Sequence, residues 1–304
     1  MSLEPALSEP KPFRILIDEA MTLTRRYFRP IYPSVAIPVS LISVVLSIVQ
    51  SYWMKGFLQT GGRPDFSMLL SGCAGFIAAI LAAVIVNTLA NTAMVAACVD
   101  AVDGKGVDMG RSWKFVLRAA VLGTLVMVWI AVAIGLVLLI IPGLYLMLVL
   151  SLTAVVMASE SRFGYGALSR SAELVRYNPQ RRFLANPKTK VAALFGIAYL
   201  LSLVVSLLVQ LPFTIVSNIL VARKVAGGMP VDPAALTKSL LWFQVPSTFL
   251  GSLASMAVAL YTSFGLALLY FDIRRRKEGI DLEAAIARLA GKPETAIPGP
   301  VPAQ

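Results

Sequence analysis

The sequence contains no histidine, two cysteines and few charged residues for its length. Without histidine, acid–base and nucleophilic mechanisms that depend on an imidazole are excluded. No cysteine-rich or paired-carboxylate spacing typical of a metal site occurs, so we expect neither a metal nor another cofactor. A serine–lysine pair is not indicated either, because no lysine lies inside an apolar stretch near a serine. We therefore expect a protein that is not an enzyme.

The composition is that of a membrane protein, with 58% hydrophobic and only 14% charged residues. The apolar stretches follow one another too closely for a soluble domain to fit between them, so we predict a single membrane domain. The two cysteines, Cys73 and Cys98, share one apolar stretch. In a helix they would lie about 37 Å apart, which excludes a disulfide between them.

Six uncharged stretches are candidates for transmembrane helices, given the roughly 20 residues needed to cross a bilayer. They are 31–53, 66–99, 119–141, 144–159, 191–222 and 239–271. We predict an all-α polytopic bundle of about six transmembrane helices with additional interfacial amphipathic helices. The predicted organisation is an amphipathic segment at 1–30, the transmembrane domain at 31–271, a charged flank with a short helix at 272–291, and a disordered tail at 292–304.

The stretch 144–159 is short for a crossing and leaves three arrangements open. It lies deep in the protein, spans a locally thinned membrane, or forms the returning half of a re-entrant hairpin with the preceding stretch. Pro142 and Gly143 lie between the two stretches, and both are typical turn residues. The sequence therefore predicts a hairpin that turns at these two positions.

The lysines and arginines predict the orientation, because short loops rich in them stay in the cytoplasm. One set of flanks holds 22 of these residues and the other holds five. The richer side includes both ends of the chain. We expect a multi-pass protein of a bacterial cytoplasmic membrane, with both termini in the cytoplasm.

Three segments outside the apolar stretches are predicted to be amphipathic helices, at 13–28, 167–177 and 281–290. Their bases would form a basic collar, and each would gain about 1 kcal/mol near anionic lipid headgroups. A solvated positive flank is the alternative interpretation. Nucleic acid is not an expected partner, because the bases flank membrane helices. The candidate headgroup contacts are Arg25, Arg26, Arg181, Arg182, Arg275 and Arg276.

Uncharged polar residues interrupt the apolar stretches at a few places, among them Asn87, Asn91 and Gln210. Hydrogen bonds between helices are the favoured role for these three, and a binding or permeation site is the alternative. Small residues recur every fourth position from Gly75 to Asn91 and from Ser247 to Ala267. We predict that these two ridges pack closely against neighbouring helices.

Three motifs carry a resemblance to a known family: "IPGLYL", "SESRFGYGALSRSAELVR" and "LYFDIRRRKEGIDLE". In this order and spacing they resemble bacterial six-helix membrane proteins related to the membrane domain of glycerophosphoryl diester phosphodiesterases. The phosphodiesterases of that family carry a separate soluble barrel with histidine and carboxylate metal ligands. This sequence contains no histidine, so the resemblance implies the membrane domain without the catalytic activity.

The same motifs suggest an ion-pair network that fastens the loop after the fourth stretch to the end of the sixth. Its expected members are Glu160, Arg170, Asp272 and Arg274. As function we expect lipid binding, or scaffolding of a membrane or cytoplasmic protein, through the basic collar. The alternative is a transporter or permease component for a small or lipidic solute. A polar path that reaches the asparagines or Gln210 would favour transport.

Overall fold

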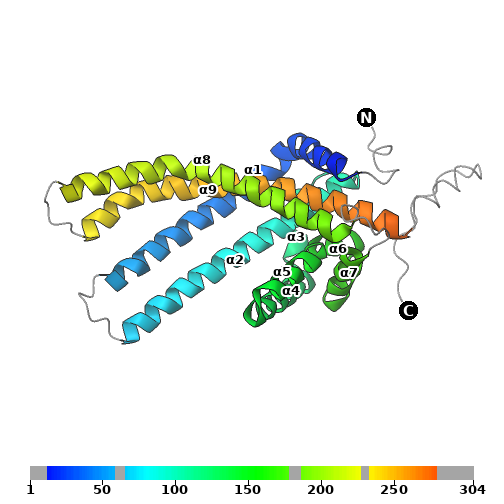
Figure 1. Ribbon diagram of the computed structural model, residues 1–304, viewed down its shortest axis with the longest axis horizontal. Coiled ribbons are helices and arrows are strands. Elements are labelled where there is room, and N and C mark those ends of the chain that lie inside the picture. Colours follow the sequence, from blue (N-terminus) through cyan, green and yellow to red (C-terminus); the bar gives the residue numbers. More distant parts are fainter. Residues whose placement is uncertain (1–11, 59–65, 178–185, 227–232, 279–304) are drawn as a thin grey trace, which may run out of the picture. The chain divides into compact units, whose positions relative to one another are not determined.

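The computed structural model describes residues 12–58, 66–177, 186–226 and 233–278, which are helical with no strand among them (Figure 1). This confirms the predicted all-α class. The predicted helix at 281–290, the tail at 292–304, and Arg181 and Arg182 lie outside the described residues. The helices are α1 Phe13–Leu58, α2 Phe66–Val102, α3 Met109–Val116, α4 Ala119–Leu138, α5 Ile140–Leu150, α6 Thr153–Glu160, α7 Tyr165–Arg176, α8 Pro187–Ala226 and α9 Pro233–Glu278.

Within these ranges, six helical stretches are long and apolar enough to cross a membrane, the number predicted from the sequence. The first of them begins well before residue 31, because α1 runs on through Pro30 and Pro33 without a break. The six stretches are Phe13–Ser51, Cys73–Val102, Ala119–Leu138, Ile140–Glu160, Pro187–Leu220 and Trp242–Glu278.

The chain divides into two compact units, and neither is continuous in sequence. Unit 1 comprises 1–31, 92–197 and 260–304, and unit 2 comprises 32–91 and 198–259. Each of the four long helices α1, α2, α8 and α9 contributes residues to both units.

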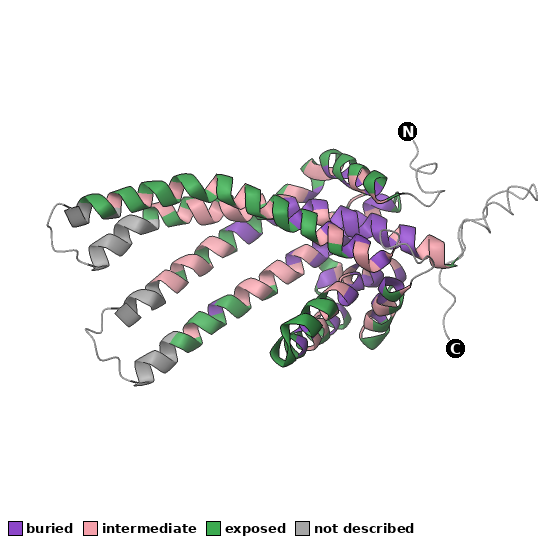
Figure 2. Ribbon diagram, viewed as in Figure 1, coloured by how far each residue is buried: buried purple, intermediate pink, exposed green. Residues whose placement is uncertain are grey.

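Unit 1 has a well-packed core, formed by the end of α2, by α6, by one face of α7 and by the last turns of α9 (Figure 2). Helix α6 is buried because its sequence is largely apolar. It is short because Ser161, which follows it, adopts the left-handed conformation that ends the helix. Among the largest side chains with less than 2% exposure are Met94, Met157, Leu174, Phe264 and Tyr270.

Helices α4 and α5 of unit 1 form a tight antiparallel hairpin (Figure 1). Its turn is not at Pro142 and Gly143, as predicted, but at Leu139, which has an extended backbone (φ −165°, ψ 141°). Pro142 sits in the first turn of α5, where a residue without an N–H is tolerated. Gly143 allows α5 to approach α4 closely, because a Cβ there would lie 2.7 Å from the backbone nitrogen of Leu136.

Unit 2 consists of parts of α1, α2, α8 and α9. Hydrogen bonds join the parts of α1 and α9 that belong to this unit. The Tyr32 hydroxyl donates to the Leu253 carbonyl oxygen at 2.8 Å, and the Ser51 hydroxyl donates to Gln244 Oε1 at 3.1 Å. Gln244, a polar residue of the sixth apolar stretch, therefore bonds two helices together.

Candidate functional site

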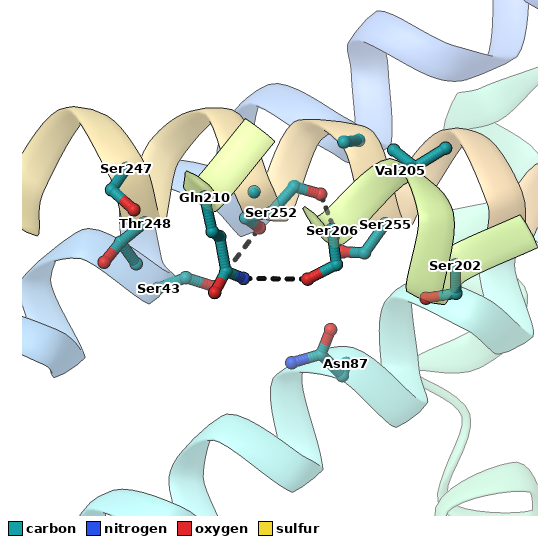
Figure 3. Close-up of a pocket in the computed structure, with 12 residues that line it drawn as sticks. Ser43, Asn87, Ser202, Val205, Ser206, Gln210, Ser247, Thr248, Ser252 and Ser255 are labelled. Carbon is teal, nitrogen blue, oxygen red and sulfur yellow. Dashed lines mark hydrogen bonds between the residues drawn. The ribbon is translucent and has the colours of Figure 1, made fainter. Parts of the chain in front are cut away.

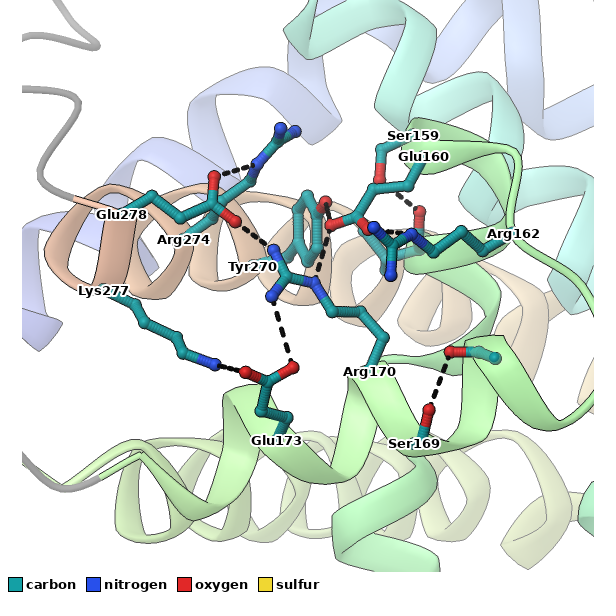
Figure 4. A network of polar contacts seen from close by, with 12 residues as sticks. Ser159, Glu160, Arg162, Ser169, Arg170, Glu173, Tyr270, Arg274, Lys277 and Glu278 are labelled. Carbon is teal, nitrogen blue, oxygen red and sulfur yellow. Dashed lines mark hydrogen bonds and ion pairs between the residues drawn. The ribbon is translucent and has the colours of Figure 1, made fainter. Parts of the chain in front are cut away.

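A buried carboxylate organises the charged end of unit 1 (Figure 4). Glu160 is the last residue of α6, and its side chain is 1% exposed. The Tyr270 hydroxyl and Arg170 Nε both donate to Glu160 Oε1, at 2.7 and 3.1 Å. Arg162 Nε lies 3.1 Å from the other carboxylate oxygen, without the geometry of a hydrogen bond. Two cations and one hydroxyl thus compensate the buried charge.

The network continues from Arg170 to the last turns of α9. Arg170 donates to Glu173 and Glu278, and Glu278 also accepts from Arg274 Nε at 2.8 Å. Lys277 of α9 donates to Glu173 of α7. These contacts fasten α6 and α7 to α9, and they bring three of the four expected members, Glu160, Arg170 and Arg274, into one cluster.

Asp272 lies in a second cluster. Its carboxylate accepts from Lys190 Nζ of α8 at 2.9 Å and from Arg276 Nε at 3.1 Å. The side chains of Asp272 and Lys190 are only 4% and 5% exposed. Helix geometry explains the separation, because positions 270, 274 and 278 share one face of α9, while 272 and 276 lie on the opposite face.

The pKa shifts outside the spans agree with this pairing. Burial lowers the pKa of the Arg170 guanidinium, but Glu160 and Glu278 outweigh that effect, so its pKa is raised overall. The hydrogen bond from Lys277 is the main cause that holds the pKa of Glu173 below its usual value. Both shifts favour the charged forms, as expected for a structural ion-pair network.

The described candidates for lipid-headgroup contact fall into two groups. Arg25 and Arg26 are exposed on α1, and Arg26 also stacks against the Tyr27 ring with 5.5 Å between its guanidinium carbon and the ring centroid. Arg275 and Arg276 both have interaction partners inside the protein, and Arg276 pairs with Asp272. Most of the basic residues on α7 and α9 therefore face carboxylates of the chain itself.

A second candidate site lies in unit 2, where four helices line a polar cavity of about 400 Å³ (Figure 3). All lining residues belong to the candidate membrane spans, and none of them carries a charge. Nine contribute a hydroxyl or an amide: Ser43, Asn87, Ser202, Ser206, Gln210, Ser247, Thr248, Ser252 and Ser255. The cavity thus offers neutral donors and acceptors in an otherwise apolar region.

The two amides of the cavity bond within their own helices. Asn87 Nδ2 donates to the Ala83 carbonyl oxygen at 2.8 Å, and Gln210 Nε2 donates to the Ser206 hydroxyl at 2.9 Å. Figure 3 shows both amides at the cavity, on α2 and α8. Asn91 is half-buried and is not among the lining residues. The described hydrogen bonds of Asn87 and Gln210 therefore stay within their own helices, which leaves their alternative role, in a binding or permeation site, as a prediction.

The small-residue ridge of α9 has two different environments. Ser263 and Ala267, in unit 1, are buried, as close packing requires. Ser247, Gly251 and Ser255 instead line the cavity of unit 2. A Cβ at Gly251 would meet only Gln210 Nε2, at 3.7 Å, so this glycine does not mark a close helix contact. The prediction of tight packing is wrong for this half of the ridge.

The polar role of the cavity serines was not predicted, because each serine alone is unremarkable in a membrane helix and those of α9 were interpreted as a packing ridge. The spacing of the polar residues along each helix was the indication available in the sequence. Ser202, Ser206 and Gln210 recur every fourth residue on α8, and Ser247 and Ser255 lie eight residues apart on α9. Two polar stripes at helical spacing could have indicated a polar face in each helix.

Comparison with known proteins gives no further assignment, since no family model, curated protein or solved structure matches the chain. Among the described residues, no group of three or more histidine, cysteine, aspartate or glutamate side chains could hold a metal ion.

Proposed function

We propose that the protein is a transporter or permease component for a small, uncharged, hydrogen-bonding solute. One observation carries the proposal: the cavity of unit 2, with nine hydroxyl and amide side chains and no charged residue among those that line it. Polar groups inside a membrane domain are costly and frequently functional. Gathered around one cavity, they can replace the water shell of a polar solute.

The size of the cavity sets the class of solute. Its volume of about 400 Å³ lies at the small end of ligand sites, and corresponds to about a dozen water molecules. A small polyol, sugar or amide fits this volume. An ion would lack a compensating charge among the lining residues, so we expect selection for neutral solutes.

The α1 part of the predicted basic collar supports a second proposal, binding of anionic lipid headgroups. The exposed arginines Arg25 and Arg26 favour it, because they lie outside the helix face that buries Leu16 and Ala20. Replacement of both arginines with glutamine should reduce retention of anionic lipid in native mass spectra. Replacement of Arg276, which pairs with Asp272, should not reduce it.

We also propose a non-enzymatic role, cytoplasmic termini and a family for the protein. The absence of histidine supports a protein that is not an enzyme, and the excess of basic residues on one set of flanks supports cytoplasmic termini in a bacterial cytoplasmic membrane. The resemblance of the three motifs to those of the phosphodiesterase membrane domain supports the proposal that the chain belongs to that family.

Osmotic swelling of proteoliposomes, followed by stopped-flow light scattering, tests the transport proposal without labelled substrates. The solutes would be urea, glycerol, a pentitol and a hexose, with potassium chloride as the charged comparison. We expect a permeability above that of protein-free liposomes for at least one neutral solute and none for the salt. Permeability equal to that of empty liposomes for every neutral solute would refute the proposal.

A matched pair of variants then assigns the permeability to the cavity. Gly251→Ile adds a side chain at the cavity wall, and we expect it to lower the permeability at least tenfold. Gly196→Ile is the control, because a Cβ at Gly196 meets nothing within 4 Å. If both variants transport like the wild type, the solute does not pass through this cavity.

A further inference from the structure

The hairpin of α4 and α5 lies between two polar boundaries. Arg118 precedes α4, Glu160 ends α6, and residues 119–159 between them carry no charge. A chain that crosses the membrane twice normally exposes a polar turn on the far side. Here the turn is a single apolar residue, Leu139.

Two hydrogen bonds join the hairpin to α7. The Gly164 N–H, at the start of α7, donates to Thr124 Oγ1 of α4 at 2.7 Å. The Ser171 hydroxyl of α7 donates to the Val149 carbonyl oxygen of α5, also at 2.7 Å. Thr124 and Val149 therefore lie beside α7.

Helix α7 lies at the water-facing surface, because its outer face carries charged side chains. Glu173 is more than half exposed and pairs with Lys277 at the charged end of α9. The opposite face of α7 is buried, with Ala167, Leu174 and Val175 inside. This pattern is typical of a helix at the interface between water and lipid.

The parts of α4 and α5 between their contacts with α7 and the turn at Leu139 are too short to cross the bilayer. At the α-helical rise, α5 extends about 14 Å from Val149 to Ile140, and α4 extends about 21 Å from Thr124 to Leu138. The hydrocarbon core is about 30 Å thick. A hairpin that starts at the level of α7 therefore ends inside the hydrocarbon.

The tip has the chemistry that this position requires. Five consecutive aliphatic side chains are exposed there, from 67% at Leu139 to 87% at Val137 (Figure 2). Both backbone groups of the turn residue are paired within the hairpin, because the Leu139 N–H donates to the Gly135 carbonyl at 3.1 Å and the Leu139 carbonyl accepts from the Gly143 N–H at 3.2 Å.

We infer that α4 and α5 form a re-entrant hairpin that enters the bilayer from the side of α7, ends among the acyl chains and returns to the same side. The chain then crosses the membrane four times, not six. Both numbers are even, so the placement of the two termini is the same, and the distribution of basic residues does not distinguish the two topologies.

Depth-dependent fluorescence quenching in liposomes tests the inference. The probe would be a nitrobenzoxadiazole group on Leu139→Cys, with Cys73 and Cys98 replaced by alanine, and the quenchers would be spin labels on the headgroup or deep in the acyl chain. We expect the strongest quenching from the deep label. The control, Leu117→Cys just before α4, should be quenched most by the headgroup label.

Stronger quenching of the Leu139 probe by the headgroup label would overturn the re-entrant hairpin, because a tip that reaches the opposite surface is shallow. Val137→Cys provides a second position, at the most exposed side chain of the tip. Labelling of either tip cysteine by a membrane-impermeant maleimide, from the side opposite to Leu117→Cys, would also overturn it. Each variant should first show the thermal unfolding midpoint of the cysteine-free parent.

Discussion

The buried ion pair between Asp272 and Lys190 should be worth far more than an exposed pair of the same length. The two side chains are 4% and 5% exposed, with 2.9 Å between Lys190 Nζ and Asp272 Oδ2. Asp272→Asn preserves the shape but leaves the Lys190 ammonium buried with a neutral partner. Removal of one member of a buried pair costs about 3–5 kcal/mol, and we expect a loss of unfolding free energy in that range.

The matched control is the pair of Lys105 and Asp103, which has nearly the same length, 3.0 Å, but side-chain exposures of 59% and 23%. Water and salt screen such a pair, so Asp103→Asn should cost between about 0 and 1 kcal/mol. Unfolding in mixed micelles with increasing sodium dodecyl sulfate, followed by circular dichroism, measures both values. Equal losses for the two variants would show that burial does not set the strength of the Asp272 pair.

A double-mutant cycle separates the pair from its surroundings. Lys190→Met removes the ammonium, and Asp272 then keeps Arg276 as a partner. The double variant has no charge of this pair left to compensate. Its loss of unfolding free energy should therefore be smaller than the sum of the losses of the two single variants, by about 1–3 kcal/mol. Additive losses would contradict the direct coupling of the two side chains.

Two further predictions concern the hairpin and the surface network. Gly143→Ala should destabilise the protein by about 1–3 kcal/mol, because the new Cβ would lie 2.7 Å from the backbone of Leu136. Gly123→Ala, with nothing within 4 Å, should not destabilise it, and detergent melting curves compare the two. The lowered pKa of Glu173 means that its bond to Lys277 stabilises the fold above the usual glutamate pKa near 4.5 and is lost as the pH falls through the lower folded value. Glu173→Gln should therefore lower the melting temperature more at pH 7 than at pH 3.5, and an equal effect at both would contradict the pairing.

The role of individual polar residues could be predicted only in part. Gln244 and Gln210 are both glutamines in apolar helices, yet Gln244 accepts a hydrogen bond from Ser51 of α1, whereas Gln210 lines the cavity and donates to Ser206 of its own helix. Residue type sets which bonds a side chain can make. The neighbouring helix decides which of them it makes.

The sequence by itself determined the membrane class, the number of apolar helices and the position of the charged flanks, because composition and the length of apolar stretches are local properties. It also indicated that Glu160, Arg170 and Arg274 belong together. Only the tertiary structure decided that Asp272 faces Lys190, because this depends on which face of α9 meets α8. The cavity and the turn at Leu139 were likewise decided by packing, since the cavity combines side chains from four helices far apart in sequence and the turn depends on the contact of α4 with α5.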